Sequence, residues 1–230
     1  MRLRGGVPNT ADSASTASVH IAAEIMAMIG ATSSEPITNP GAALESAVES
    51  HILADLPSLR PDVAWEVKRN RLVSEFEQYH HLSQLQALID ADASRTLAVE
   101  IGGDYLIRPD VTVGVTSEAG APRLHASVSC KWTIRSDRVQ NIRHEAVVLI
   151  RHRRGRLPHI VCVTMEPLPS RLASIARGTG EVDCVYHPVL AELRVAVEGV
   201  GPAPQRSILE ELIEQRRLRP LEELAPTLAL

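Results

Sequence analysis

Three ionisable residues stand at spacings that could support metal-dependent hydrolysis of a phosphodiester. Asp110 follows a proline, Lys131 ends a segment of alternating apolar and polar residues, and Glu145 comes fourteen residues later. Carboxylate oxygens are the ligands that hard cations such as Mg²⁺ prefer. Such a cation polarises the phosphate and lowers the pKa of a bound water, and a nearby ammonium group stabilises developing negative charge. The three residues are therefore candidates for one active site.

Two of these residues, Lys131 and Glu145, also have an ordinary structural interpretation. Lys131 could lie at the edge of a sheet with only its aliphatic stem buried, as lysine often does. Glu145 could pair on a helix surface with Arg138 or Arg151. Taken one at a time, a structural role is the more common outcome. The assignment therefore depends on all three residues fitting a single arrangement.

The pattern around these residues predicts how they are positioned. From Leu124 to Lys131 apolar and polar residues alternate, which predicts a strand with Ser129 and Lys131 on the same face. Glu145 lies three residues after Ile142 on the helix that follows, so it stands beside the apolar stripe and can face the sheet. A strand end and a helix would thus bring the ammonium and the carboxylate together.

The rest of the chain alternates helical and strand-like patterns. Mixed helices and strands in one chain predict an α/β domain, with a central mixed sheet flanked by helices. We expect a single domain over residues 1–230, with an N-terminal arm or helix at 1–40 and a C-terminal appendage at 199–230. The predicted helices are 20–29, 42–56, 71–92, 137–152, 188–198 and 207–217, and the predicted strands are 105–115, 124–131, 159–165 and 182–186.

The basic residues are unevenly distributed. The whole chain has a formal net charge of −4. Between Lys131 and Arg156, however, eight lysine or arginine residues stand against two acids, a local charge of +6. Such an excess can neutralise the phosphates of nucleic acid, although a solvated basic face would have the same composition. Charge alone leaves both interpretations open.

Composition argues against several classes of protein. Hydrophobic residues make up 44% and charged residues 23%, as in ordinary globular domains. No run approaches eighteen apolar residues, and residues 5–18 are small and polar, so we expect neither a membrane span nor a signal peptide. The three cysteines lack CxxC spacing, which argues against a disulfide framework or a zinc site. We expect a reduced, cytoplasmic protein.

A longer stretch of the chain resembles a known family. The fourteen residues from His125 to Arg138, which read HASVSCKWTIRSDR, are similar to NgoMIV-type restriction endonucleases almost residue for residue. The runs from Gly155 to Val161 and from Pro169 to His187 resemble the same enzymes. The similarity extends over roughly residues 5–195. It implies a restriction-endonuclease-like core.

The candidate residues match the signature of the wider PD-(D/E)XK nuclease superfamily. Pro109-Asp110 resembles its first half, and Ser129-Cys130-Lys131 its second half, with serine in place of the usual acid. In the NgoMIV-type group, which reads CCGG, that acid lies on the following helix, where Glu145 stands. The resemblance implies a pair of Mg²⁺ ions held by Asp110, Glu145 and the backbone carbonyl of Cys130. It also implies that Lys131 orients or activates the water, with support from Glu45 and Ser129.

The resemblance also assigns residues that would read bases. Arg135, Asp137 and Arg138 would recognise CCGG, because arginine can donate to O6 and N7 of guanine and aspartate can accept from N4 of cytosine. Asp12 and Arg171 match positions that read the outer base pair. The implied site is the palindrome GCCGGC, cut after the first G to leave 5′ CCGG overhangs. Without the resemblance, a helix cap with local ion pairs is a less favoured but open interpretation of the Arg135–Arg138 cluster.

The implied partners follow from the palindrome. Double-stranded DNA with two-fold symmetry calls for a homodimer, and the family implies a dimer of dimers that bridges two sites. A cognate DNA methyltransferase would protect the host, and no membrane partner is expected. Two other functions stay open: a PD-(D/E)XK nuclease for repair or DNA structure, which would cut regardless of GCCGGC, and a DNA-binding protein that does not cleave. The presence of Asp110, Lys131 and Glu145 disfavours the second.

Overall fold

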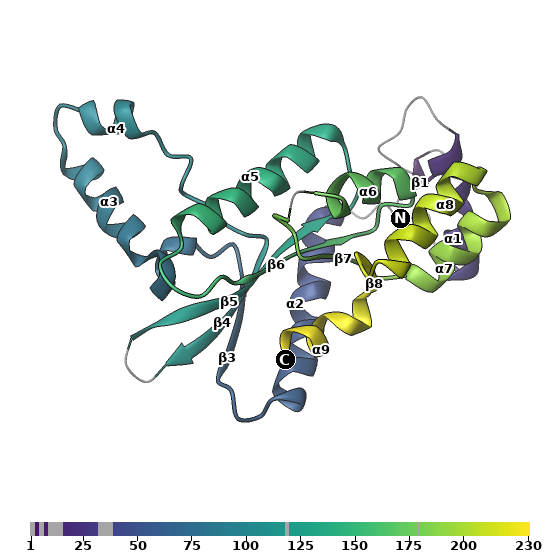
Figure 1. Cartoon of the computed structure of the whole chain (residues 1–230), viewed down its shortest axis with the longest axis horizontal. Coiled ribbons are helices and arrows are strands. Elements are labelled where there is room, and N and C mark those ends of the chain that lie inside the picture. Colours follow the sequence, from purple (N-terminus) through teal and green to yellow (C-terminus); the bar gives the residue numbers. More distant parts are fainter. Residues whose placement is uncertain (1–2, 5–6, 9–15, 32–38, 118–119, 179) are drawn as a thin grey trace.

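A six-stranded mixed sheet forms the centre of the molecule (Figure 1). The computed structural model describes residues 3–4, 7–8, 16–31, 39–117, 120–178 and 180–230. The strand order is β3-β4-β5-β6-β7-β8, with antiparallel pairing from β3 to β5 and parallel pairing from β5 to β8. The strands are β3 Trp65–Arg69, β4 Val111–Ser117, β5 Gly120–Lys131, β6 His159–Thr164, β7 Cys184–His187 and β8 Leu218–Pro220. This confirms the α/β fold with a central mixed sheet.

Helices cover both faces of this sheet. Two further short strands, β1 Leu3–Arg4 and β2 Val7–Pro8, pair with each other outside it. The α-helices are α1 Ala17–Met28, α2 Pro40–Leu59, α3 His80–Ala91, α4 Thr96–Ile101, α5 Ser136–His152, α6 Pro169–Ala176, α7 Leu190–Val200, α8 Ala203–Glu214 and α9 Leu224–Leu228. Short 3-10 turns lie at Val73–Glu75, Glu77–Tyr79 and Leu221–Glu223. No helix of the described residues is long and apolar enough to cross a membrane.

Alternation along the strands divides the core between the two faces. In β6, Val161 and Val163 pack in the cluster that contains α2 and α9, whereas Cys162 packs in the cluster of α1, α6, α7 and α8. In β7, Tyr186 belongs to the first cluster and Val185 to the second. Because both faces of these parallel strands are buried, their sequences are short, almost wholly apolar runs.

Two predicted elements are shorter in the structure than the sequence pattern indicated. The segment 71–92, predicted as one long helix or two, begins as 3-10 turns, and regular helix starts only at His80. The cause is the buried Gln78, whose side-chain amide bonds both backbone groups of Leu124 at 2.8 Å and fixes the chain against β5. The strand predicted over 105–115 begins at Val111, because the residues before it make only isolated bonds to the 70–73 turn.

The C-terminal segment is part of the main core. Residues 199–230, expected as an appendage, contribute β8 to the edge of the central sheet and α9 to the face that α2 covers. Leu224 and Leu228 are almost completely buried there. At the other end of the chain, α1 packs against α7. The sequence pattern missed β3, β8, α4, α6 and α9, all of them short.

Candidate active site

Asp110 and Lys131 meet where two antiparallel strands lie side by side. Asp110 immediately precedes β4 and Lys131 ends β5, so the start of one strand is next to the end of the other. Lys131 Nζ donates to Asp110 Oδ2 at 2.6 Å, and the backbone N–H of Cys130 donates to the same oxygen at 2.7 Å. Each of the two charged side chains is about one-fifth exposed. The pair is thus accessible from solvent yet held in one geometry.

Two glutamates from different helices share this environment. Burial raises the pKa of Glu145 on α5, the positive charge of Lys131 opposes that rise, and the negative charge of Asp110 adds to it. Burial and the charge of Asp110 likewise raise the pKa of Glu45 on α2, while Lys131 and Arg69 oppose the rise. The site therefore draws on four elements: the start of β4, the end of β5, α5 and α2.

Lys131 remains a cation in this setting. Burial by itself would lower the pKa of Lys131, but the charge and hydrogen bond of Asp110, together with Glu145, raise it above its ordinary value. The pKa of the neighbouring Cys130 thiol is well above its ordinary value because of burial and then the charge of Asp110. Cys130 is therefore no thiolate nucleophile, and Ser129 beside it is buried.

A pocket of about 490 Å³ connects this cluster to the residues proposed to read bases. Glu45, Cys130 and Lys131 line one part of it, and Asp137 and Arg138 line another. Chemistry and base reading could thus take place on one bound molecule. The pocket also includes Asn39, whose side chain accepts from the Ala42 N–H and caps the start of α2.

The donors present suit a hard divalent cation. Asp110, Glu145 and Glu45 supply carboxylate oxygens, and burial, together with the charge of Asp110, raises the pKa of both glutamates. A divalent cation would relieve the repulsion that this reflects. Among the described residues, no three Asp, Glu, His or Cys side chains already form a metal cluster. In this arrangement the Lys131 ammonium is the group that neutralises Asp110.

The cluster proposed for base reading lies at the N-terminal end of α5. Arg135 and Asp137 are more than half exposed, with Nε and Oδ1 3.7 Å apart. Arg138 is half-buried and donates through Nη1 to the backbone oxygen of Thr133 at 2.7 Å and to its hydroxyl at 3.2 Å. Local contacts are therefore present, but no side chain at the N-cap Arg135 makes a capping bond to α5, and Arg135 and Asp137 stay open to a ligand.

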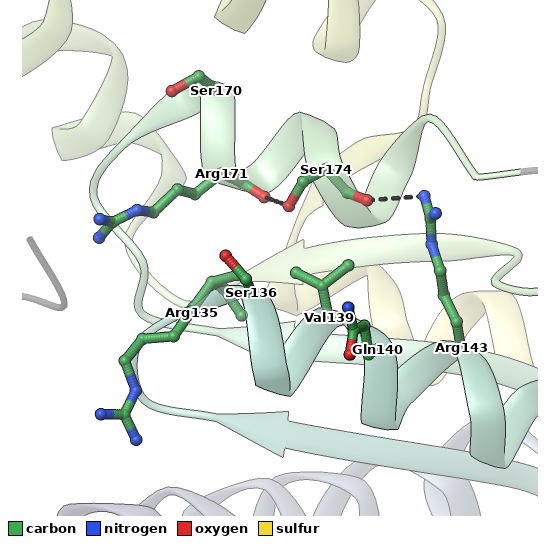
Figure 2. Close-up of a pocket in the computed structure, with 9 residues that line it drawn as sticks. Arg135, Ser136, Val139, Gln140, Arg143, Ser170, Arg171 and Ser174 are labelled. Atoms are coloured by element: carbon green, nitrogen blue, oxygen red, sulfur yellow. Dashed lines mark hydrogen bonds between the residues drawn. The ribbon is translucent and has the colours of Figure 1, made fainter.

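Arg171 lies across a second pocket from this cluster (Figure 2). The pocket, about 570 Å³, lies between α5 and α6, and the side chains of Arg135 and Arg171 extend to the same side of it. At the far end Arg143 donates to the backbone oxygen of Ser174 at 2.8 Å. The structure thus brings Arg171 near the start of α5, although Arg171 and Arg135 are 36 positions apart in the sequence. Asp12 lies outside the described residues.

Sequence reasoning missed one residue of this region. Glu166 follows β6 and is completely buried, yet it bonds the backbone that leads into α5 and the backbone that leads into α6. The available signal was a single acid in the otherwise apolar run that follows β6. An acid in such a place is seldom buried without partners.

The sequence is similar to a family of known proteins over almost its whole length. The family model of the NgoMIV restriction enzyme matches residues 2–119 and 114–230, so the similarity continues beyond the expected limit at 195. The type II restriction enzyme NgoMIV of Neisseria gonorrhoeae is 38% identical over 262 residues, which cover 98% of this chain and 91% of that protein. The crystal structure of the pre-specific restriction endonuclease BsaWI–DNA complex contains a chain that is 16% identical to this one, with a TM-score of 0.38. The match covers 84% of this chain and 69% of the BsaWI chain. The chain belongs to the NgoMIV restriction enzyme family.

Proposed function

We propose that this chain is a type II restriction endonuclease that hydrolyses double-stranded DNA at GCCGGC. It cuts after the first G and leaves 5′ CCGG overhangs. Membership of the NgoMIV family supports the class of enzyme. One structural observation carries the proposal furthest: a single pocket joins Glu45 and Lys131 to Asp137 and Arg138. The proposed DNA recognition sequence, GCCGGC, rests on the similarity of residues 125–138 to the family.

Asp110 and Glu145 are the proposed ligands of Mg²⁺, as a pair of ions, together with the backbone carbonyl of Cys130. When bound, Mg²⁺ would polarise the scissile phosphate and lower the pKa of the attacking water. Lys131 would then hold that water or a phosphate oxygen with its ammonium, which the neighbouring carboxylates keep charged. Glu45 would accept a hydrogen bond from the water, and Ser129 would line the site.

The attacking oxygen forms a bond to phosphorus as the bond from phosphorus to the 3′ oxygen breaks. The protein's part is to align these atoms and stabilise the charge on the phosphate. Lys131 suits this part because it points from the end of a paired strand and is held by Asp110 at 2.6 Å. A residue fixed in this way loses little conformational entropy when DNA binds.

Arg135, Asp137 and Arg138 would read CCGG, and Arg171 with Asp12 would read the outer base pair. Arginine donates two hydrogen bonds to guanine, and each such contact contributes about 1–3 kcal/mol of discrimination. The position of Arg171 across the α5–α6 pocket from Arg135 supports this division, because the two guanidinium groups extend to the same side.

The palindrome also determines the proposed assembly. A homodimer places one active site on each strand, and a dimer of dimers would bridge two copies of the site. A DNA methyltransferase of the same specificity would protect the host DNA. We place the enzyme in the cytoplasm as part of this proposal, in keeping with three buried, unpaired cysteines.

The test uses purified protein, Mg²⁺ and plasmids with zero, one or two GCCGGC sites, with the ends mapped by sequencing. Rapid cutting of the two-site plasmid alone, with 5′ CCGG ends, supports both the site and the tetramer. Equal cutting of the one-site plasmid supports the site and contradicts a need for two. Cutting of the plasmid without a site contradicts the specificity and favours a nuclease of another kind. No cutting with any divalent cation favours a DNA-binding protein that does not cleave.

A further inference from the structure

We infer that Glu166 is a positioning residue that fixes the two base-reading segments relative to each other. The inference rests on the proposed function, because it assigns Glu166 a part in reading DNA. Glu166 lies between β6 and α6, and its side chain has no exposed surface. It touches no DNA itself and acts through the groups that it holds.

One carboxylate oxygen of Glu166 holds the segment that enters α5. Glu166 Oε2 accepts the backbone N–H of Ile134 at 2.7 Å. Ile134 is itself buried and stands one residue before Arg135, the N-cap of α5. Loss of this hydrogen bond would therefore allow the N-terminal end of α5, with Arg135 and Asp137, to change position.

The other oxygen holds the segment that enters α6. Glu166 Oε1 accepts the backbone N–H of Leu168, the N-cap of α6, at 3.2 Å. Arg171 Nη1 lies 3.7 Å from the same oxygen, with the arginine side chain about one-quarter exposed. One guanidinium nitrogen of Arg171 is thus buried beside Glu166, and the same side chain lines the α5–α6 pocket.

A buried carboxylate has a strong requirement for its partners. Removing the charge from water costs several kcal/mol unless hydrogen bonds and a counter-charge replace the lost hydration. Glu166 obtains these partners from both segments at once, and its own backbone N–H donates to Thr164 Oγ1 at 3.2 Å. Arrangements in which α5 and α6 shift apart would leave part of the charge unsatisfied. This favours one spacing between Arg135 and Arg171.

The experiment compares wild type with Glu166→Gln, which keeps the shape and removes the charge. The readout is kcat/KM for duplexes that carry GCCGGC or the same site with the outer base pair changed. We expect the ratio of the two values to fall by at least about fivefold, as for loss of one base contact. Adding Glu166→Gln to Arg171→Ala should lower the ratio little further, because the two residues act through one contact.

A merely structural role would change stability without changing this ratio. Leu224→Ala, in the core on the other face of the sheet, serves as the control for stability, and all variants are measured where they are fully folded. Thr164→Val is a milder second variant that removes only the bond to the Glu166 backbone. An unchanged ratio in folded Glu166→Gln, or in Thr164→Val if Glu166→Gln does not fold, would overturn the inference.

Hydrogen exchange without DNA separates this inference from the proposed function. Glu166→Gln should speed exchange in both the 133–136 and the 167–171 segments, while the distant β3–β4 pair is unaffected. Exchange that is unchanged in either segment overturns the inference even if GCCGGC is cut. If wild type cuts another sequence, the ratio is taken for that sequence, and the proposed specificity fails on its own.

Discussion

At the scale of single residues, the Asp110–Lys131 contact decides what the site can do. An ammonium 2.6 Å from a carboxylate on the neighbouring strand is held in place before any substrate arrives. Burial alone would lower the pKa of Lys131, but the charge and hydrogen bond of Asp110, and then the charge of Glu145 on α5, raise it above its ordinary value. Glu45 on α2 adds a further carboxylate to the same pocket. The site is therefore a fixed cation among carboxylates.

Lys131→Ala tests this site directly. Loss of the fixed ammonium should lower the single-turnover rate of DNA cleavage by about 10²-fold or more, as for other groups that stabilise transition-state charge. Binding of the uncut duplex should change little. Lys68→Ala is the control, since Lys68 is more than half exposed and pairs with Glu66. Cleavage by Lys131→Ala at the wild-type rate would show that the active site is misassigned.

His187 gives the molecule a dependence of stability on pH. It is completely buried, and burial lowers its pKa to about 4 from an ordinary value of 6.5, against which the nearby Glu166 and Val189 backbone groups act. The unfolded chain thus binds a proton below pH 6.5 that the folded chain refuses. The contribution of neutral His187 to the free energy of unfolding is therefore present above pH 6.5 and is lost as the pH falls toward about 4.

The measurement is urea unfolding at about pH 7 and about pH 5. Wild type should lose about 2 kcal/mol of unfolding free energy between them through His187 alone. The His187→Gln variant should lose correspondingly less, so the difference between the two proteins isolates this group. The same pH dependence in both would contradict the assignment.

At the scale of elements, the 3-10 turns before α3 support the sheet more than their length suggests. Gln78 bonds the N–H and the carbonyl of Leu124 at 2.8 Å, just before the pairing of β5 with β6 begins at Ala126. The neighbouring Tyr79 donates its buried hydroxyl to the backbone oxygen of Leu149 on α5 at 3.0 Å. These three bonds connect β5, which ends in Lys131, with the helix that carries Glu145.

Gln78→Leu should therefore destabilise the protein. It leaves two buried backbone groups of Leu124 without these partners, at a cost of about 1–3 kcal/mol for each unsatisfied group. The midpoint of urea unfolding should fall accordingly. Gln215→Leu, at an exposed site on the surface, should stay within about 0.5 kcal/mol of wild type. Equal midpoints for the two variants would argue against this role for Gln78.

At the scale of the whole molecule, the last thirty residues complete the core. β8 adds the final strand to the sheet, and α9 closes the face that α2 covers, next to the end of the chain (Figure 1). The candidate active site lies at the other end of α2, where Glu45 stands near the beginning of the helix. The position of α2, and with it that of Glu45, thus depends on packing made by the C-terminal segment.

Leu224→Ala measures that packing. Leu224 has no exposed surface, so truncation should lower the unfolding free energy by about 2–5 kcal/mol. Leu88→Ala, at a leucine that is 63% exposed, is the matched control and should change it little. A loss for Leu224→Ala no larger than that of the control would mean that α9 is not part of the cooperative unit.

The sequence alone predicted the elements that have strong patterns. The alternation over 124–131 and the apolar stripe of 137–152 correspond to β5 and α5, and together they placed Lys131 near Glu145. The short elements β3, β8, α4, α6 and α9 were missed because a few residues carry too little periodicity to stand out. The start of α3 was wrong because Gln78 bonds to a strand 46 positions away, which local pattern does not report.

What the sequence determined by itself was the kind of chemistry and the family, since residue types and their order along the chain carry both. Tertiary structure alone decided which residues meet. Asp110 and Lys131 are brought together by antiparallel pairing, Glu45 by the packing of α2, and Arg171 by the bond from the Ile134 N–H to the neighbouring Glu166. These are contacts across many positions of the chain, and they form because burial of both sheet faces and the pairing of buried charges select one arrangement.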